Sequence, residues 1–353
     1  MDRTKSENKK KPDTAETKPN PGPQGENTVT IKDLTVEYKM KKYSIRAACG
    51  VSLDIKRGRM TALVGESGSG KTTVASALLN CISTPGEIVS GEIIFQGKDG
   101  GVVDVGRLNE KQLNAFRWSR ISMVFQGAQS SLNPVMTILD HFYETMKVHE
   151  PKTTKGDAAD RTRRVLSVVN LNADRIMKMY PHELSGGMKQ RVMIAMSLLL
   201  DPELIILDEP TTALDVITQD YIFKILKRIN KETGIAMLLL THDISIVAKF
   251  TDYMAVMYAG RVVEYGKTAD VFRHKAHPYT RGLIMATPSL YGDLESMKPI
   301  GGAPPDLIEL PEGCVFRPRC PYADETCGRE EPILRTVGEN HLSRCQKEVF
   351  HVK

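Results

Sequence analysis

A short apolar segment that runs directly into a glycine-rich loop constrains the fold of this chain more than any other feature. Residues 60–64, MTALV, have the composition of a buried strand, and residues 65–72, GESGSGKT, follow at once. Helical character then extends from Lys71 to Leu79. In this strand–loop–helix setting, the backbone N–H groups of the loop curl around a phosphate. The sequence therefore predicts an α/β fold that contains a phosphate-binding loop.

The side chains of this loop indicate how it holds a nucleotide. Glycines 65, 68 and 70 allow the backbone to curl inward. Lys71 places a positive charge at the β- and γ-phosphates, and the hydroxyl of Thr72 is a Mg²⁺ ligand. We expect the following loop residues to bind the nucleotide: Ser67, Gly68, Ser69, Gly70, Lys71, Thr72 and Thr73.

A second phosphate-binding pattern lies more than a hundred residues further along the chain. In residues 184–190, LSGGMKQ, Ser185 and the two glycines after it stand just ahead of an amphipathic helix. Their backbone N–H groups and the serine hydroxyl converge at the positive end of the helix dipole, which suits a phosphate. One chain therefore presents two separate phosphate-binding surfaces.

An apolar segment of the parallel-strand type ends in two carboxylates that suit phosphate chemistry. ELIILDEP at 203–210 delivers Asp208 beside the phosphates, where it holds Mg²⁺ through water. Glu209 points elsewhere, because successive strand residues alternate in direction, and is placed to polarise an attacking water as general base. Without the phosphate loop, two solvated carboxylates would be the ordinary interpretation.

His242 and Gln126 are two further candidates at strand ends. IAMLLLTHD at 235–243 places His242 at the sheet edge where ligands bind in open α/β folds. That position favours a contact with the γ-phosphate, although a lone histidine is more often a surface or core residue. Gln126 ends ISMVFQ at 121–126 and is expected to reach either Mg²⁺ or the attacking water.

The order and spacing of these motifs, with TALD at 212–215, resemble the nucleotide-binding subunit of an ABC transporter over roughly residues 29–273. The resemblance implies a P-loop ABC ATPase with a RecA-like parallel sheet core, an antiparallel β subdomain and a helical subdomain at about 127–200. It also implies that the chain binds ATP and Mg²⁺ and hydrolyses ATP to ADP and phosphate.

The same resemblance implies roles for the candidate residues. It places Thr72, Gln126 and Asp208 around Mg²⁺. It makes Glu209 the catalytic base and puts His242 on the γ-phosphate, and it lets Gln126 couple the site to membrane subunits.

Two further implications concern the adenine and the LSGG turn. In that family an upstream aromatic residue stacks on adenine; its position is similar to Tyr38, with Tyr43 as the alternative, and Tyr38 also fits plain strand packing. The LSGG turn of one subunit faces the ATP that a partner ATPase holds. In this chain the residues that would face the partner's ATP are Ser185, Gly186, Gly187 and Gln190.

Four of the six cysteines crowd into residues 314–345, whereas Cys49 and Cys81 have the surroundings of ordinary buried thiols. The four are spaced C-x5-C-x6-C-x17-C and are Cys314, Cys320, Cys327 and Cys345. Without a secretory signal, disulfides are the weaker explanation. Structural zinc sites usually include a close C-x2–4-C pair, which is missing, and four thiolates also satisfy a [4Fe–4S] cluster. Cluster, zinc and disulfides stay open on spacing alone.

The C-terminal region refines the resemblance. HPYTRGL at 277–283, followed by Pro-rich sequence and the four cysteines, resembles ATPases of the oligopeptide/dipeptide importer subfamily, which also serves nickel and oligosaccharides. Members of that subfamily carry a [4Fe–4S] cluster in this region, so the resemblance implies one here. The neighbouring Arg317, Arg319 and Arg344 either offset the charge of the cluster or face solvent.

Composition divides the chain into three parts. Residues 1–27 are polar and Pro-rich and are expected to be disordered, residues 28–274 form the ATPase domain, and residues 275–353 form a small Cys-rich tail domain. No apolar run approaches the ~20 residues that span a bilayer, and no signal peptide begins the chain. A net charge of +5 without a basic stripe argues against nucleic acid as a partner.

These observations together predict the ATP-hydrolysing subunit of an importer, peripheral on the cytoplasmic face of the cell membrane. It would pair with a second ABC ATPase, most simply as a heterodimer, and drive two transmembrane permease subunits that an external solute-binding protein supplies. Peptides are the default cargo, with oligosaccharides or nickel as alternatives. A soluble ABC ATPase is less consistent, because each motif occurs once and no heptad run exists. A non-hydrolysing ATP-binding module conflicts with intact Glu209 and His242.

Overall fold

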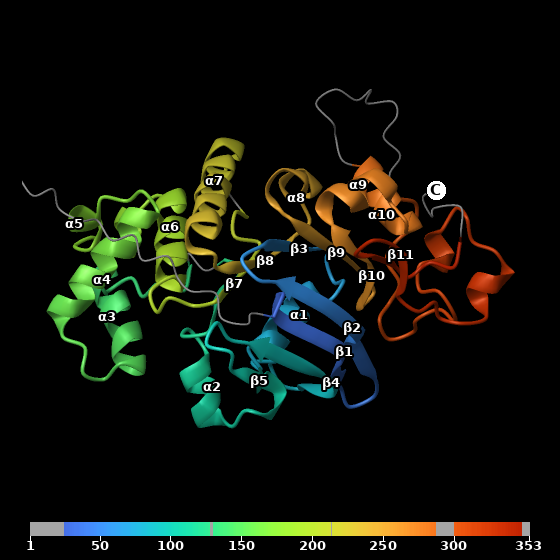
Figure 1. Ribbon diagram of the computed structural model, residues 1–353, viewed down its shortest axis with the longest axis horizontal. Coiled ribbons are helices and arrows are strands. Elements are labelled where there is room, and N and C mark those ends of the chain that lie inside the picture. Colours follow the sequence, from blue (N-terminus) through green and yellow to red (C-terminus); the bar gives the residue numbers. More distant parts are fainter. Residues whose placement is uncertain (1–24, 128–129, 213, 287–299, 348–353) are drawn as a thin grey trace, which may run out of the picture.

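The computed structural model describes residues 25–127, 130–212, 214–286 and 300–347. Of the tail expected to be disordered, residues 1–24 lie outside the described part, and strand β1 already starts at Asn27. Figure 1 shows an elongated molecule in which the helices α3–α6 form one end and the C-terminal segments the other. Two sheets lie between these ends.

The larger sheet has eight strands within the described residues, in the order β11-β12-β10-β9-β3-β8-β7-β6. The run from β9 to β6 is parallel, and the run from β9 to β11 is antiparallel. The strands are β3 (Met60–Val64), β6 (Ile121–Val124), β7 (Leu204–Asp208), β8 (Ala236–Thr241), β9 (Tyr253–Tyr258), β10 (Arg261–Lys267), β11 (Arg335–Gly338) and β12 (His341–Ser343).

Burial explains why the parallel strands read as unbroken apolar runs. Every residue of β3, β6, β7 and β8 is buried, as expected where helices cover both faces of a parallel sheet. The hairpin β9–β10 turns at Ala259 and Gly260, whose φ angles are 47° and 78°. Two positive φ values in a two-residue turn match the twist of the flanking strands, as a tight hairpin requires.

A smaller antiparallel sheet, in the order β2-β1-β4-β5, packs its apolar face over helix α1. Its strands are β1 (Asn27–Lys39), β2 (Ser44–Lys56), β4 (Gly86–Gln96) and β5 (Val102–Asp104). Val74 and Leu78 of α1 belong to the same hydrophobic cluster as Val36 and Leu53 of this sheet. The antiparallel sheet therefore braces the helix that follows the glycine-rich loop.

Ten α-helices occur in the described ranges, and none is long and apolar enough to cross a membrane. They are α1 (Lys71–Leu78), α2 (Glu110–Phe116), α3 (Ile138–His149), α4 (Lys155–Val168), α5 (Ala173–Ile176), α6 (Gly186–Ser197), α7 (Val216–Thr233), α8 (Ile244–Phe250), α9 (Thr268–His274) and α10 (Pro278–Met285). Helices α3–α6 fall in the segment predicted to be helical. The polar, Lys-rich residues near 150–160 form only a short loop before α4, because Thr154 and Asp157 form a capping box that starts this helix at Lys155.

In the described residues, the C-terminal segment that the composition sets apart packs on the central sheet. Strand β12 pairs with β10 and so extends the central sheet. Val315 and Phe316 pack with Val64 of β3 and Val256 of β9. A short segment with few large apolar residues cannot bury enough surface alone, so it covers one end of the ATPase sheet instead.

Candidate functional site

The glycine-rich loop and the ends of the parallel strands enclose a cavity of about 300 Å³. The loop curls between β3 and α1, where the order strand–loop–helix places its N–H groups at the start of the helix. The cavity is lined by Ala47, Ser67, Gly68, Ser69, Gly70, Lys71, Thr72, Thr73, Gln126 and Glu209. The structure thus brings the seven nucleotide-binding candidates of the loop together with two of the candidate residues from the strand ends.

Close packing explains the glycine at position 70. Its φ is 99°, and a Cβ there would lie 2.1 Å from the carbonyl oxygen of Ala47 on β2. Gly68 has a φ of 77° with open space around it, so only its backbone conformation favours glycine. The curl of the loop therefore depends on both the left-handed backbone and the nearby strand β2.

Lys71 is folded back onto its own loop. Its Nζ donates hydrogen bonds to the carbonyl oxygens of Gly65 at 2.8 Å and Glu66 at 3.0 Å. Burial lowers the pKa of Lys71, and the carboxylates of Glu209 and Asp208 oppose that shift. A buried ammonium held by neutral carbonyls is well placed to exchange them for phosphate oxygens, which carry charge.

Thr72 and Asp208 form the oxygen pair expected at a Mg²⁺ site. The hydroxyl of Thr72 donates to Asp208 Oδ2 at 3.0 Å, and the Asp208 side chain is buried at the end of β7. Burial raises the pKa of Asp208, against the hydrogen bond from Thr72. A hydroxyl and a carboxylate at hydrogen-bond distance are hard oxygen donors, so these two residues fit a magnesium ion.

Glu209 collects three polar partners from separate segments. Its Oε1 lies 3.1 Å from His242 Nδ1, and its Oε2 accepts hydrogen bonds from Gln126 Nε2 and Thr212 Oγ1, each at 3.1 Å. These partners follow β8, β6 and β7, whose carboxyl ends meet at one edge of the parallel sheet. The strand-end candidates therefore converge on one carboxylate.

Glu209 and Asp208 do diverge as expected, but not by strand alternation. Strand β7 ends at Asp208, and Glu209 has a φ of 45°, in the left-handed region that non-glycine residues rarely adopt. A non-glycine residue in this region is strained, and strained residues of this kind are often found at functional sites. The reversed backbone sends the Glu209 side chain toward Gln126 and His242, while Asp208 faces Thr72.

The LSGG turn lies on a different part of the molecule. Ser185 caps helix α6, and its hydroxyl accepts a hydrogen bond from the N–H of Met188 at 3.3 Å. Helix α6 packs in the helical end together with α4 and β6, whereas the phosphate cavity opens at the loop before α1. Figure 1 shows the two helices as separate parts of the fold. The structure therefore keeps the two expected phosphate surfaces apart within one chain.

The two tyrosines considered for adenine stacking lie on the antiparallel sheet and in the turn before one of its strands. Tyr38 lies on β1 opposite Gly86 of β4 and packs, partly buried, against the core under the antiparallel sheet. Tyr43 is exposed in the turn before β2. Thr212 was missed as a partner of Glu209, although its presence in the TALD motif was the signal that pointed to it. Ala213 of that motif lies outside the described residues.

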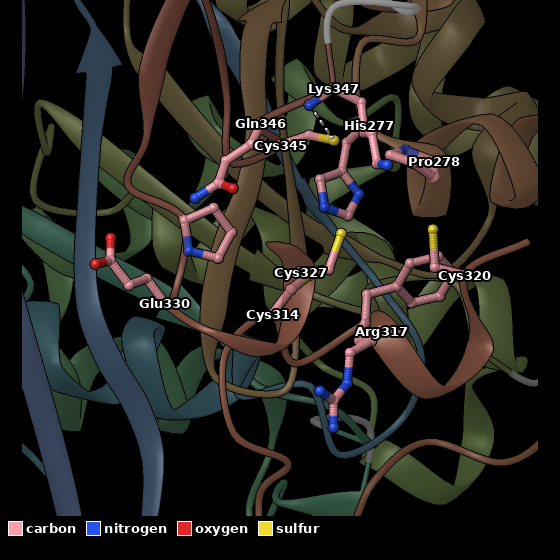
Figure 2. A pocket seen from close by; sticks show the side chains of 12 residues that line it. His277, Pro278, Cys314, Arg317, Cys320, Cys327, Glu330, Cys345, Gln346 and Lys347 are labelled. Carbon is pink, nitrogen blue, oxygen red and sulfur yellow. Dashed lines mark hydrogen bonds between the residues drawn. The ribbon is translucent and has the colours of Figure 1, made fainter. Parts of the chain in front are cut away.

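The four C-terminal cysteines line one cavity, which Figure 2 shows from close by. They come from the loops around the short helical turns at 317–319 and 325–328 and from the segment after β12. His277, Phe316 and Arg317 lie at the same cavity. Residues 314–327 and the segment after β12 thus bring all four thiols of the predicted set to one cavity.

The four thiols line the same cavity, but in this structure they are not close enough together to bind a metal ion. In the described ranges, no three His, Cys, Asp or Glu side chains gather closely enough to hold a metal ion. Burial raises the pKa of Cys320 to about 11, with smaller contributions from Cys314, Cys345 and Cys327. The number and kind of donors are those of a four-thiolate site, but in this structure the side chains do not approach one another closely enough to hold a metal ion.

The three arginines beside the cysteines separate into different roles. Arg317 lines the cysteine cavity. Arg344 donates to the carbonyl oxygen of Val262 at 3.1 Å, and Arg319 pairs with Glu66 of the glycine-rich loop. The side chain of Arg319 is 7% exposed, so the solvent-facing alternative is wrong for this residue.

Comparisons with known proteins agree with this arrangement. A family model described as "ABC transporter" matches residues 49–212, and one described as "Oligopeptide/dipeptide transporter, C-terminal region" matches residues 263–327. The chain is 42% identical to the dipeptide transport ATP-binding protein DppD of Caldanaerobacter subterraneus subsp. tengcongensis, over 89% of this chain and 95% of the relative. It is also 42% identical to the oligopeptide transport ATP-binding protein OppD of Salmonella typhimurium, over 90% of this chain and 93% of that protein.

Solved structures agree as well. A dimeric, post-hydrolysis state of the ATP-binding cassette MJ0796, bound to ADP and phosphate, superimposes with a TM-score of 0.60 at 30% identity. The superposition covers 68% of this chain and 98% of the cassette.

Proposed function

Because the chain belongs to the ABC transporter family and is an ATPase of that family, we propose that it powers the import of peptides. The observation that carries this proposal is the 42% identity, over nearly the whole chain, to ATP-binding subunits named for dipeptide and oligopeptide transport. The match to the oligopeptide/dipeptide C-terminal region supports it independently. Oligosaccharides and nickel remain the alternative cargoes.

In this proposal residues 28–274 form the ATPase region and residues 275–353 a C-terminal region attached to the same sheet. ATP binds with its β- and γ-phosphates in the cavity of the glycine-rich loop. Lys71 releases its loop carbonyls and pairs with the phosphates, while Thr72 and Asp208 hold Mg²⁺, with Gln126 close by. Mg²⁺ supplies positive charge to the phosphate oxygens when it is bound. Tyr38 supplies the stacking surface for adenine.

Glu209 acts as the general base that takes a proton from the attacking water. Its carboxylate lines the phosphate cavity and is held at 3.1 Å by both Gln126 and His242. These contacts orient the carboxylate before the nucleotide arrives. With ATP bound, His242 exchanges its contact with Glu209 for one with the γ-phosphate; its side chain is 68% exposed, which leaves room for this rotation.

A second ATPase subunit completes each site. The LSGG turn lies on α6, away from the chain's own phosphate cavity, so it serves an ATP held by a partner. The surface offered to that ATP consists of Ser185, Gly186 and Gly187, whereas Gln190 of the same motif is buried in this chain. The dimeric state of the similar ATP-binding cassette supports this pairing. We propose a related but different chain as the partner.

Two transmembrane permease subunits and an external solute-binding protein complete the importer. The chain would then sit peripherally on the cytoplasmic face of the cell membrane. The helical end formed by α3–α6 offers the surface for the permeases. Gln126 lines the phosphate cavity, and α3 is the next helix along the chain. Movement of Gln126 on hydrolysis would be transmitted along this segment.

Replacing Glu209 with glutamine tests the function. The Glu209→Gln variant keeps the shape of the side chain but removes the base, so ATP hydrolysis by the assembled importer should slow by roughly 10²–10⁴-fold. ATP affinity should stay near that of the wild type, since the phosphate contacts remain. Uptake of labelled dipeptides and tetrapeptides into vesicles should fall with hydrolysis. Phosphate release, ATP titration and uptake would be measured side by side.

Glu232→Gln, on the exposed face of α7, is the matched control and should leave all three measurements unchanged. Peptide uptake that continues at the wild-type rate in the Glu209→Gln importer would contradict the assignment. Uptake of oligosaccharides or Ni²⁺ but not of peptides would overturn the cargo and leave the ATPase role intact.

We also propose that Cys314, Cys320, Cys327 and Cys345 hold a [4Fe–4S] cluster. All four line one cavity, which is the donor set such a cluster needs. A bound cluster would supply four iron–thiolate bonds that tie the C-terminal loops together and a centre that exchanges single electrons. Arg317, at the same cavity, would offset its negative charge, and the backbone N–H of Lys347 donates to Cys345 Sγ at 3.5 Å.

Iron analysis of anaerobically purified protein tests the cluster. The wild type should contain about four irons and four sulfides per chain and absorb at roughly 400 nm. Cys320→Ser should lose most of this iron, whereas Cys81→Ser, on a thiol packed in the core below α1, should keep it. Zinc in place of iron in the wild-type protein would rule the cluster out.

A further inference from the structure

Glu66, the second residue of the glycine-rich loop, has each of its polar groups held by a different partner. Its N–H donates to Tyr279 Oη at 3.1 Å, and its carbonyl oxygen accepts from Lys71 at 3.0 Å. Its carboxylate accepts two hydrogen bonds from the guanidinium of Arg319, at 3.0 and 3.2 Å. Two of these three partners come from the C-terminal region, more than two hundred residues away in sequence.

Arg319 is fixed on several sides. Its Nε donates to the carbonyl oxygen of Gly301 at 2.9 Å, and its guanidinium lies over the ring of Tyr258 at 5.7 Å. The side chain is 7% exposed, so solvent screens the pair with Glu66 only weakly. A bidentate arginine–carboxylate pair fixes direction as well as distance. The position of Glu66 is therefore set by the C-terminal segment.

Tyr279 is fixed as firmly. It is fully buried, and its ring contacts Tyr258 and Phe316 at centroid distances of 4.6 and 5.4 Å. The preceding His277 donates its N–H to the buried carboxylate of Glu264 on β10 at 2.8 Å. The segment His277–Tyr279, here called the HPY segment, is thus anchored on the central sheet, and the hydroxyl of Tyr279 faces the glycine-rich loop.

The C-terminal segment also covers the outer side of the loop. Pro304, Pro305 and Leu307 line a small second cavity, of about 20 Å³, together with Glu66 and Ser67. Glu66 lines this small cavity and is not among the residues that line the cavity of about 300 Å³ that suits the phosphates. Arg319 draws the Glu66 carboxylate toward this covered side. The negative charge of Glu66 is thereby neutralised and turned away from the phosphates.

From these contacts we infer that Arg319 and Tyr279 are positioning residues of the phosphate loop, through which the C-terminal region sets the affinity for ATP. Arg319 holds the carboxylate of Glu66 and Tyr279 holds its N–H, so the loop keeps the curl that the triphosphate needs. The inference rests on the proposed role of the loop in binding ATP. It assigns the HPY segment a role in positioning the phosphate loop, which the proposed import function alone does not assign.

The same contacts join the loop to the cysteine cavity. Arg319 precedes Cys320 in the chain, and Phe316 both lines the cysteine cavity and packs on Tyr279. A change at the thiols that moves Phe316 or Arg319 therefore changes the hold on Glu66. By linkage, ATP bound at the loop must influence the cysteine cavity to the same extent.

Titration of the full-length chain with a fluorescent ATP analogue tests the inference. Arg319→Gln should weaken affinity by about tenfold, since charge-assisted hydrogen bonds are lost and each tenfold corresponds to about 1.4 kcal/mol. Tyr279→Phe keeps the ring packing and should weaken affinity by roughly threefold to fivefold. Arg329→Gln, which breaks only an exposed pair with Glu325, is the control and should bind like the wild type.

A double-variant cycle separates positioning from general destabilisation. If Arg319 acts through Glu66, Arg319→Gln in a Glu66→Gln background should change affinity by less than about twofold. An equal tenfold loss in both backgrounds would mean that Arg319 only supports the fold, and would overturn the inference. Thermal unfolding of each variant is recorded in parallel. Should Arg319→Gln fail to fold, Tyr279→Phe and Arg319→Lys decide, because wild-type affinity in both would overturn the inference.

Lys71→Ala distinguishes this inference from the proposed function. If Lys71→Ala binds the ATP analogue like the wild type, the phosphate loop itself is misassigned. If Lys71→Ala abolishes binding while Arg319→Gln and Tyr279→Phe bind like the wild type, only the positioning role is refuted.

Discussion

At the scale of single residues, the site depends on backbone conformations that side-chain chemistry alone does not reveal. Glu209 reaches Gln126 and His242 because its φ of 45° turns the chain away from the direction of β7. Gly70 has a φ of 99° and lies against the carbonyl of Ala47, so the loop closes only where no Cβ is present. Both positions put strain or close contact at the phosphate cavity, where the surrounding sheet maintains them.

Gly70→Ala tests the close packing of the loop. The added Cβ would meet a backbone oxygen at 2.1 Å in a left-handed conformation, so we expect a loss of about 1–3 kcal/mol in unfolding free energy. ATP affinity should fall as well, because the loop must shift. Urea unfolding and ATP titration measure the two effects. Gly106→Ala, whose Cβ would make an ordinary 3.4 Å contact, should change stability by less than about 0.5 kcal/mol. Wild-type stability in Gly70→Ala would contradict the packing argument.

At the scale of elements, helix boundaries depend on local capping that the sequence pattern hid. Residues near 150–160 are polar and Lys-rich and read as a loop, yet α4 starts at Lys155. Thr154 accepts the N–H of Asp157 at 3.2 Å, and Asp157 accepts the N–H of Thr154 at 3.0 Å. These reciprocal bonds satisfy two donors that the first helical turn leaves open. The polar residues Thr154 and Asp157 are therefore the N-terminal cap of α4 and not part of a loop.

The capping box of α4 predicts a pH-dependent contribution to stability. Hydrogen bonds from the side chain and backbone of Thr154 lower the pKa of Asp157. A carboxyl group with a depressed pKa stabilises the folded state above its unfolded pKa of about 3.9 and loses this effect as the pH falls through its folded value. Asp157→Asn should therefore destabilise the protein at pH 7 and approach the wild type as the pH falls below about 4.

Urea unfolding at a series of pH values checks this contribution. Asp160→Asn, one turn further along α4, is the control: it breaks only an exposed pair with Arg163 and should change the free energy of unfolding little at pH 7. A difference between Asp157→Asn and the wild type that stays constant from pH 7 to about 3 would refute the role of the charged cap.

At the scale of the whole molecule, one sheet carries all parts of the site. Its parallel strands bring Gln126, Glu209 and His242 to one edge, and β10 joins the C-terminal strand β12 to the same sheet. The helical end and the C-terminal region therefore lie on opposite ends of a shared core, as Figure 1 shows. The phosphate cavity lies at a loop whose Glu66 is paired with Arg319 of the C-terminal region. This geometry lets events at either end reach the phosphate cavity.

The sequence by itself determined the parts whose chemistry is local. The phosphate loop needs a strand, glycines and a lysine in fixed order, and the parallel strands need unbroken apolar runs; both stand within short windows of the chain. The turn at Ala259–Gly260 and the start of α6 after Ser185 were likewise predictable, because turns and caps act over a few residues. Family resemblance added the roles of these parts.

Only the tertiary structure decided which distant residues meet. Glu66 and Arg319 stand 253 positions apart, and no spacing rule links a loop glutamate to one arginine among many. Gln126 and His242 reach Glu209 because their strands are neighbours of β7 in the sheet. Local sequence patterns do not specify this strand order. The C-terminal segment joined the ATPase sheet because it has too little apolar surface for a core of its own. Long-range pairing of this kind is settled by burial across the whole fold.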